Sequence, residues 1–149
     1  MKKLYFIIAF SSIFLGALIY VLWRPETLIM FSWFSNLKIG PSVAFLRNNF
    51  GNPPQYLPEW IIYSLPSALW LFAGILIFSG IWKEFSKEFI FWTIIFLLIA
   101  YGGEIGQAMG VVPGTFCFKD INTMIIANFV GVLTVFVLKQ KKGLKNDNT

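Results

Sequence analysis

The sequence predicts an all-α, polytopic membrane protein with four transmembrane helices and an interfacial helical segment between the first and the second. Hydrophobic residues make up 57% of the 149 residues and charged residues only 13%. A soluble domain keeps about a quarter of its residues charged. The apolar residues also gather in four long runs, each long enough to cross a bilayer. We therefore expect one membrane domain, residues 1–149, whose main partner is the lipid bilayer.

Three of the predicted spans cover residues 4–23, 89–109 and 121–138, and residues 139–149 form a polar tail. The first run follows two lysines, so a cleaved signal peptide is the competing interpretation. The run of about 20 residues exceeds a usual signal core, and its small-residue cleavage pattern is poor. We expect it to be retained as a helix.

The second span is predicted at residues 60–82. Trp60 and Trp82 lie 22 residues apart, about 33 Å along a helix, which places an indole at each interface of one hydrocarbon layer. Pro66 predicts a kink in the first third of this span. Ser64 stands near enough to help satisfy a carbonyl that the proline frees.

The basic residues predict the orientation. With the N-terminus inside, eight lysines are cytoplasmic and only four basic residues lie outside, which fits the positive-inside rule. Both termini are then cytoplasmic, in a bacterial inner (plasma) membrane. The basic residues are divided between ends and loops and form no patch, so we expect no nucleic-acid partner. The outer four are Arg24, Lys38, Arg47 and Lys119.

The outer segment, residues 24–59, is too apolar for an ordinary loop. Gly40 and Pro41 are a typical helix start, and Gly51 begins a run that ends a helix. We expect one or two short helices lying in the outer interface. They serve either as a hydrophobic lid over the helix ends or as a surface that contacts a ligand.

The candidate site begins with Glu104, since a carboxylate inside a membrane span costs several kcal/mol unless it is paired, protonated or hydrated. Tyr101 and Gln107 lie three residues to either side, so the three side chains share one helix face near the outer end of the third span. Beyond the loop, further candidates follow in chain order: Thr115, Asp120, Asn122 and Asn128.

A short loop makes the third and fourth spans neighbours in the chain, so we expect them to pack as an antiparallel hairpin. Thr123, Asn122 or Asn128 could then hydrogen-bond to Glu104 or Gln107. Three interpretations stay open for this cluster. It is a structural hydrogen-bond network, a binding cavity that opens outward, or part of a proton or ion path.

The residue inventory argues against several chemistries. The chain has no histidine and a single cysteine, Cys117, so we expect no metal site, no cofactor and no internal disulfide. No histidine is present to activate a serine or threonine nucleophile. An acid–base pair of Glu104 and Asp120 rests only on two carboxylates at the same end of the bundle. Enzymatic activity is therefore not expected.

The order Glu104-x-x-Gln107, a glycine-bearing loop, Asp120, then Asn128-x-x-Gly131 resembles the VanZ-like family of small bacterial membrane proteins. Relatives also carry a Gly-Thr-Phe-Asp loop and a Leu-Pro-Asp-x-x-Trp motif, which residues 114–117 and 65–70 resemble. The resemblance covers roughly residues 63–131.

This chain departs from the family in three ways. The family's loop arginine is missing, Ser67 and Cys117 stand where relatives have aspartate, and the spacing from Asp120 to Asn128 is longer than usual. The resemblance implies a role in the cell envelope, because the founding member is associated with teicoplanin resistance. It implies no particular reaction.

We therefore expect a VanZ-like membrane protein whose outward-facing polar pocket recognises an envelope lipid head group or a lipid-linked precursor. Two alternatives remain. The chain is an accessory subunit that binds other membrane proteins in a larger complex, or it is a small transporter.

The orientation yields a first prediction. In a chain carrying Cys117→Ser, a membrane-impermeant thiol reagent applied to intact cells should label Asn36→Cys and leave Lys145→Cys unlabelled. In the predicted topology only residues 24–59 and the loop at residues 110–120 face outward. Labelling of position 145 together with protection of position 36 contradicts this topology.

Overall fold

The computed structural model describes residues 2–54, 57–112 and 114–146, with side chains up to residue 141, and every regular element in those ranges is a helix. The predicted all-α class is therefore confirmed. The helices are α1 (Lys2–Trp23), α2 (Ile29–Asn36), α3 (Gly40–Phe50), α4 (Glu59–Tyr63), α5 (Leu65–Ile81), α6 (Lys87–Ala108) and α7 (Phe118–Asn146).

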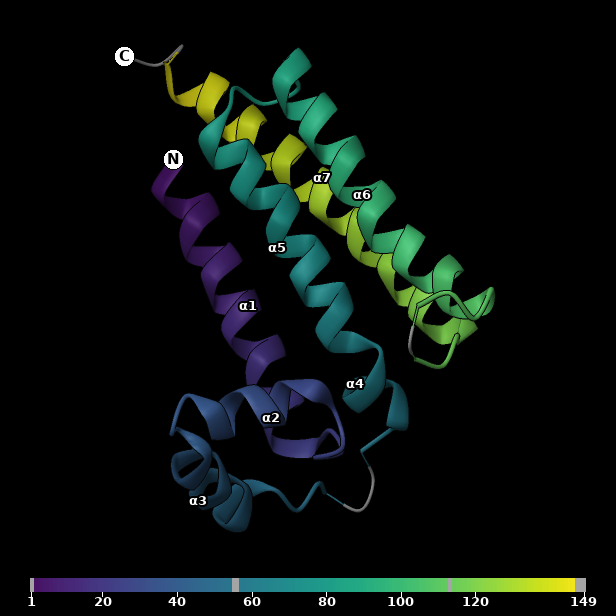
Figure 1. Ribbon diagram of the computed structural model, residues 1–149. Coiled ribbons are helices and arrows are strands. Elements are labelled where there is room, and N and C mark those ends of the chain that lie inside the picture. Colours follow the sequence, from purple (N-terminus) through teal and green to yellow (C-terminus); the bar gives the residue numbers. More distant parts are fainter. Residues whose placement is uncertain (1, 55–56, 113, 147–149) are drawn as a thin grey trace.

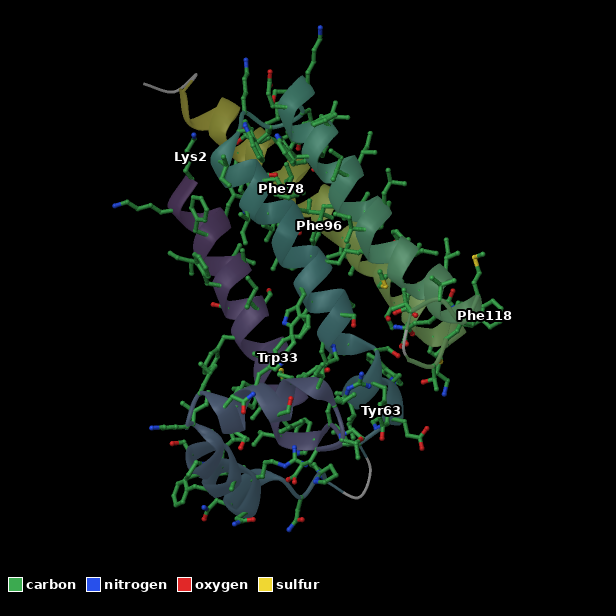
Figure 2. All side chains as sticks on the ribbon, in the orientation of Figure 1. Lys2, Trp33, Tyr63, Phe78, Phe96 and Phe118 are labelled. Atoms are coloured by element: carbon green, nitrogen blue, oxygen red, sulfur yellow. The ribbon has the colours of Figure 1, made fainter. Side chains whose placement is uncertain are left out.

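The four longest helices lie alongside one another, and the shorter helices gather at one end (Figure 1). The start of α1 and the last turns of α7 lie together at the opposite end. Figure 2 shows the same polarity in its labelled side chains, with Lys2 at one end and Trp33 and Tyr63 at the other. We call the end that carries α2, α3 and α4 the capped end.

Three helices are long and apolar enough to cross a membrane: α1, α6 and residues Phe118–Lys141 of α7. The protein therefore has the character of a multi-pass membrane protein. Helix α5 is equally apolar but has 17 residues. Helix α7 begins three residues before the predicted span and continues through most of the predicted tail, to Asn146.

The predicted second span is divided into two helices. Helix α4 ends at Tyr63, α5 begins at Leu65, and Ser64 forms the joint. The break arises because Pro66 has no N–H to donate to the carbonyl one turn earlier. The helical hydrogen-bond pattern resumes directly after the break, since the amide of Ala68 donates to the carbonyl of Ser64.

Helix α5 is the centre of the bundle. It packs against α1 on one side and against α7 and α6 on others, while α1 touches neither α6 nor α7 within the described residues. The buried core follows this arrangement, since α5 contributes more of its residues than any other helix and is joined by Tyr5 and Ala9 from α1, Phe89 from α6, and Met124 and Val135 from α7. The expected hairpin of α6 and α7 is accordingly looser than predicted, because α7 packs mainly on α5.

Glycines set how closely the helices approach α5. A methyl group added at Gly74 would collide with the ring of Phe96 on α6, and one at Gly80 would lie 2.9 Å from the ring of Phe6 on α1. Phe96 also meets Phe78 edge to face, with ring centroids 5.5 Å apart (Figure 2). Small residues thus permit close helix packing, which stabilises helix pairs where water provides no driving force.

The capped end is fastened to α1 by Arg47 of α3. Its guanidinium donates hydrogen bonds to the carbonyls of Val21 and Arg24, at 2.5 and 3.0 Å, and forms a 3.0 Å salt bridge with Glu26. These carbonyls lie at the end of α1 and have no partner within the helix. Helix α3 itself begins at Gly40 and ends before Gly51, as the sequence predicted.

The glycine packing yields a second prediction. Gly74→Ala should destabilise the protein by about 1–3 kcal/mol, because the added methyl group forces the Phe96 ring out of its packed position. Gly102→Ala is the matched control, since a methyl group there meets nothing within 4 Å. Thermal unfolding in detergent should show a lower melting temperature for the first variant and an unchanged or higher one for the second. Equal melting temperatures would contradict this account of the α5–α6 contact.

Candidate functional site

A cavity of about 660 Å³ lies at the capped end, where α1, α4, α5, α6, α7 and the loop before α7 meet. A cavity of this size is in the range that holds small ligands. Polar and charged residues form much of its lining: Tyr20, Arg24, Glu59, Tyr63, Ser64, Ser67, Glu104, Gln107, Thr115, Cys117, Lys119 and Asp120. We call it the polar cavity.

The structure brings four of the seven sequence-predicted site residues to this cavity. Glu104 and Gln107 come from the last turns of α6, Thr115 from the loop, and Asp120 from the first turn of α7. The loop folds back onto α6, since the amides of Val111 and Val112 both donate to the carbonyl of Gly106. These four candidates therefore lie around one cavity.

The other three candidates do not line the polar cavity. Tyr101 packs against the hydrophobic core, and Asn122 is exposed at the start of α7. Asn128 is half-buried, and its Oδ1 has no hydrogen-bond partner within the described residues. The predicted bonds from α7 to Glu104 are also not formed by Thr123, whose hydroxyl donates to backbone carbonyls of its own helix.

A hydrogen bond between α5 and α7 forms one wall of the cavity. The hydroxyl of Ser64 donates to Oδ1 of Asp120. Ser64 is only 1% exposed, so its hydroxyl depends on this acceptor. From the sequence, this hydroxyl could have helped to satisfy a carbonyl freed by Pro66. The break between α4 and α5 instead turns it toward α7.

Gly114 fits closely against Gln107. Its φ of +142° is strained for a residue with a side chain, and an added Cβ would lie 2.7 Å from Cδ of Gln107. The loop can therefore pass over the end of α6 only with glycine at this position. This contact keeps the Gln107 amide at the cavity wall.

Glu104 carries an unsatisfied oxygen. Its Oε2 is buried and has no hydrogen-bond partner within the described residues. A buried carboxylate oxygen without a partner costs free energy, so its place beside a polar cavity needs an explanation. Glu104 itself lines the cavity, so its carboxylate is placed to accept a hydrogen bond from a hydroxyl or ammonium group of a ligand there.

Arg24 is the main site residue that the sequence interpretation missed. Its guanidinium lies 5.1 Å from the ring centroid of Tyr20 and 5.2 Å from that of Tyr63, and its Nε is buried with no hydrogen-bond partner among the described residues. The sequence placed Arg24 outside as a flanking charge. The Tyr20–Arg24 spacing of four residues, which aligns two side chains on a helix face, was the available signal.

The cavity lining combines both signs of charge. Arg24 and Lys119 are cationic, whereas Glu59, Glu104 and Asp120 are acidic. No group of three or more potential metal ligands occurs among the described side chains. The chemistry available here is hydrogen bonding and ion pairing with a polar, charged ligand.

Comparison with protein-family models, with curated proteins and with solved structures finds no match for this chain. Its site must therefore be interpreted from its own residues.

The wall between α5 and α7 yields a third prediction. Asp120→Ala should destabilise the protein by about 1–3 kcal/mol, because it leaves the buried Ser64 hydroxyl without an acceptor. Adding Ser64→Ala should cost less than the sum of the two single changes, with a coupling of about 0.5–3 kcal/mol in a double-mutant cycle measured by equilibrium unfolding in mixed micelles.

The matched control is Ser79→Ala. Ser79 is also fully buried on α5, but its hydroxyl donates within its own helix, to the carbonyl of Ile75. Its combination with Asp120→Ala should be additive. Additivity of the Ser64 pair as well would rule out an energetically significant bond across this wall.

Proposed function

We propose that this chain is a VanZ-like protein of the bacterial inner membrane that binds a cell-envelope component in its polar cavity. The ligand is a lipid head group or the head of a lipid-linked precursor. The observation that carries this proposal is the gathering of Glu104, Gln107 and Asp120 with Arg24 around one cavity of about 660 Å³. Glu104 and Gln107 lie on α6 and Asp120 on α7, whereas Arg24 directly follows the end of α1, far away in the sequence.

Two positions add support for the family resemblance. Ser67 and Cys117, which stand where relatives would have aspartate, both line the polar cavity. Arg24 also brings a guanidinium to the same place, although the loop that carries an arginine in the family lacks one here. Several of the residues that carry the resemblance thus line this cavity, whereas Asn128 and Gly131 do not.

The proposed topology has four spans, with α4 and α5 together forming the second. An even number of spans places both ends of the bundle on one side of the membrane. This agrees with the first turns of α1 and the last turns of α7, which lie at the same end of the bundle (Figure 1). That end carries Lys2, Lys83 and Lys139, which supports a cytoplasmic position under the positive-inside rule. The capped end then faces outward, and α2 and α3 lie in the outer interface as a cover.

An accessory subunit of a membrane complex is the alternative, and α6 favours it. Only Phe89 and Thr93 of this helix are buried. Gly102 and Gly103 have open space beside their Cα atoms, which would allow a partner helix to approach closely. Neither glycine is part of the polar-cavity lining, so substitutions at these positions can test this alternative separately.

The proposed function yields a fourth prediction. In a deletion strain complemented with variants, Glu104→Gln and Asp120→Asn should each abolish an envelope phenotype, measured as glycopeptide sensitivity. Each substitution removes a charge from the cavity but keeps a hydrogen-bonding side chain of similar size. Protein abundance on quantitative membrane immunoblots should be unchanged.

Glu88→Gln serves as the control, because Glu88 is exposed in the first turn of α6, at the other end of the bundle. It should complement fully. If phenotype and abundance fall together for the cavity variants, the acids have a structural role. Full complementation by both cavity variants would favour the accessory subunit over the binding cavity.

A further inference from the structure

A second cavity, of about 430 Å³, lies between α5 and α7 and is almost wholly apolar. Leu65 and Phe72 line it from α5, and Ile126 and Val130 line it from α7. Its one hydroxyl, that of Thr123, is already donated to the backbone of its own helix. We call this cavity the apolar crevice.

The crevice adjoins the polar cavity. Trp60 lines both. Along α5, Ser64 borders the polar cavity and the next residue, Leu65, borders the crevice. Along α7, Asp120 and Thr123 make the same transition within one helical turn. The two cavities are therefore neighbours, one polar and one apolar, that share Trp60 as part of their walls.

The two cavities are arranged differently along α7 and along α5. Helices α5 and α7 run in the same direction, since Ser64 bonds Asp120 near their starts and Ile75 packs on Gly131 eleven residues later in each. The crevice lining extends from Leu65 to Phe72, seven residues further from the capped end, or about 10 Å along the helix. Along α7 the crevice lining, from Thr123 to Val130, lies further from the capped end than the polar lining at Lys119 and Asp120, whereas along α5 the two cavities occupy neighbouring faces of the same turns.

The crevice opens at the surface of the bundle. Trp60, Ile126 and Val130, which form part of its lining, all have large exposed fractions. In a bilayer this surface faces hydrocarbon, so a lipid can enter from the side. A lateral opening favours a lipid of the surrounding bilayer over a soluble ligand.

Arg24 provides the anchor for an anionic head group. The salt bridge among the described residues joins Arg47 to Glu26, and Arg24 takes part in none. Its neighbours include two aromatic rings, and its Nε has no hydrogen-bond partner in the part of the chain that the structure describes. A guanidinium presents a planar set of donors that matches the oxygens of a phosphate. Lys119 adds a second cation to the same cavity.

We propose that the two cavities bind one glycerophospholipid, with its phosphate on Arg24 and one acyl chain in the apolar crevice. A hydroxyl of its head group satisfies the free oxygen of Glu104. This inference rests on the proposed binding function and narrows it: the ligand is recognised by its phosphate and by its hydrocarbon chain together.

Cys117 provides the measurement, because it is the only cysteine and lines the polar cavity. The purified full-length protein in neutral detergent is labelled with a small maleimide. Lysophosphatidic acid, which has one acyl chain and one phosphate, should slow the labelling of Cys117 in a saturable way. A monoacylglycerol with the same chain, glycerol 3-phosphate and a short-chain lysophosphatidic acid should each be far less effective.

Variants separate the two parts of the site. Arg24→Gln should weaken protection by lysophosphatidic acid about 10- to 100-fold, the loss expected for one charge-assisted hydrogen bond. Ala127→Phe should weaken it by filling the crevice, whereas Ile125→Phe, on an exposed part of α7 outside both cavities, should not. Melting temperatures identify any variant that is misfolded, and the chain-length comparison needs no variant.

Each alternative outcome contradicts a defined part of the lipid-binding proposal. If glycerol 3-phosphate protects as well as the long-chain lipid, the acyl-chain site is wrong while the polar cavity remains a binding site. If the monoacylglycerol protects as well, the phosphate assignment is wrong. Tighter binding of farnesyl phosphate would assign the site to an isoprenoid carrier. If no probe protects Cys117 but the Glu104 and Asp120 variants still lose the envelope phenotype, this inference fails and the proposed function stands.

Discussion

The close packing of three helices on α5 is the constraint on which the rest of the structure depends. Gly74 and Gly80 let α6 and α1 approach α5, and Gly131 lets α7 approach it. Association of apolar helices in lipid gains little from the hydrophobic effect, so such contacts must come from close packing and from polar bonds. Because α1, α6 and α7 all end or begin beside the start of α5, their terminal residues converge at the capped end.

The break before α5 converts that convergence into a cavity. Helix α4 ends at Tyr63, and the buried Ser64 at the joint bonds Asp120 of α7. A continuous helix would have kept the hydroxyl in its own turn. A second polar contact forms at the end of α1, where the guanidinium of Arg47 donates to the carbonyls of Val21 and Arg24. These bonds fix the backbone that carries the Arg24 side chain. Backbone groups left free by helix ends thus position the charged residues of the site.

Much of the fold could be predicted from the sequence, because its elements follow from local patterns. Long apolar runs gave α1, α6 and α7, and the Gly40–Pro41 and Gly51 signals gave the limits of α3. Within the candidate site, the sequence indicated those lining residues that lie on segments adjacent in the chain. Glu104, Gln107, Thr115 and Asp120 follow one another in the chain, and all four line the polar cavity.

The rest of the site depends on contacts between distant segments, which local patterns do not specify. The bond between Ser64 and Asp120 joins residues 56 positions apart. Arg24 reaches the cavity only because α1 packs antiparallel to α5, which places the end of one beside the start of the other. Asn128 shows the opposite case: its sequence position suggested a partner for Glu104, yet α7 packs mainly on α5, and Oδ1 of Asn128 has no partner.

The unpartnered atoms give the strongest physical argument for a bound ligand. Oε2 of Glu104 and Nε of Arg24 are both buried without hydrogen-bond partners among the described residues, and both residues line the same cavity. The two residues carry opposite charges, yet no salt bridge joins them among the described residues. The aromatic rings that flank Arg24 hold the guanidinium without neutralising it. A ligand that carries both an anionic group and a hydroxyl would satisfy both residues at once, and a lipid head group with an acyl chain in the adjoining crevice has that composition.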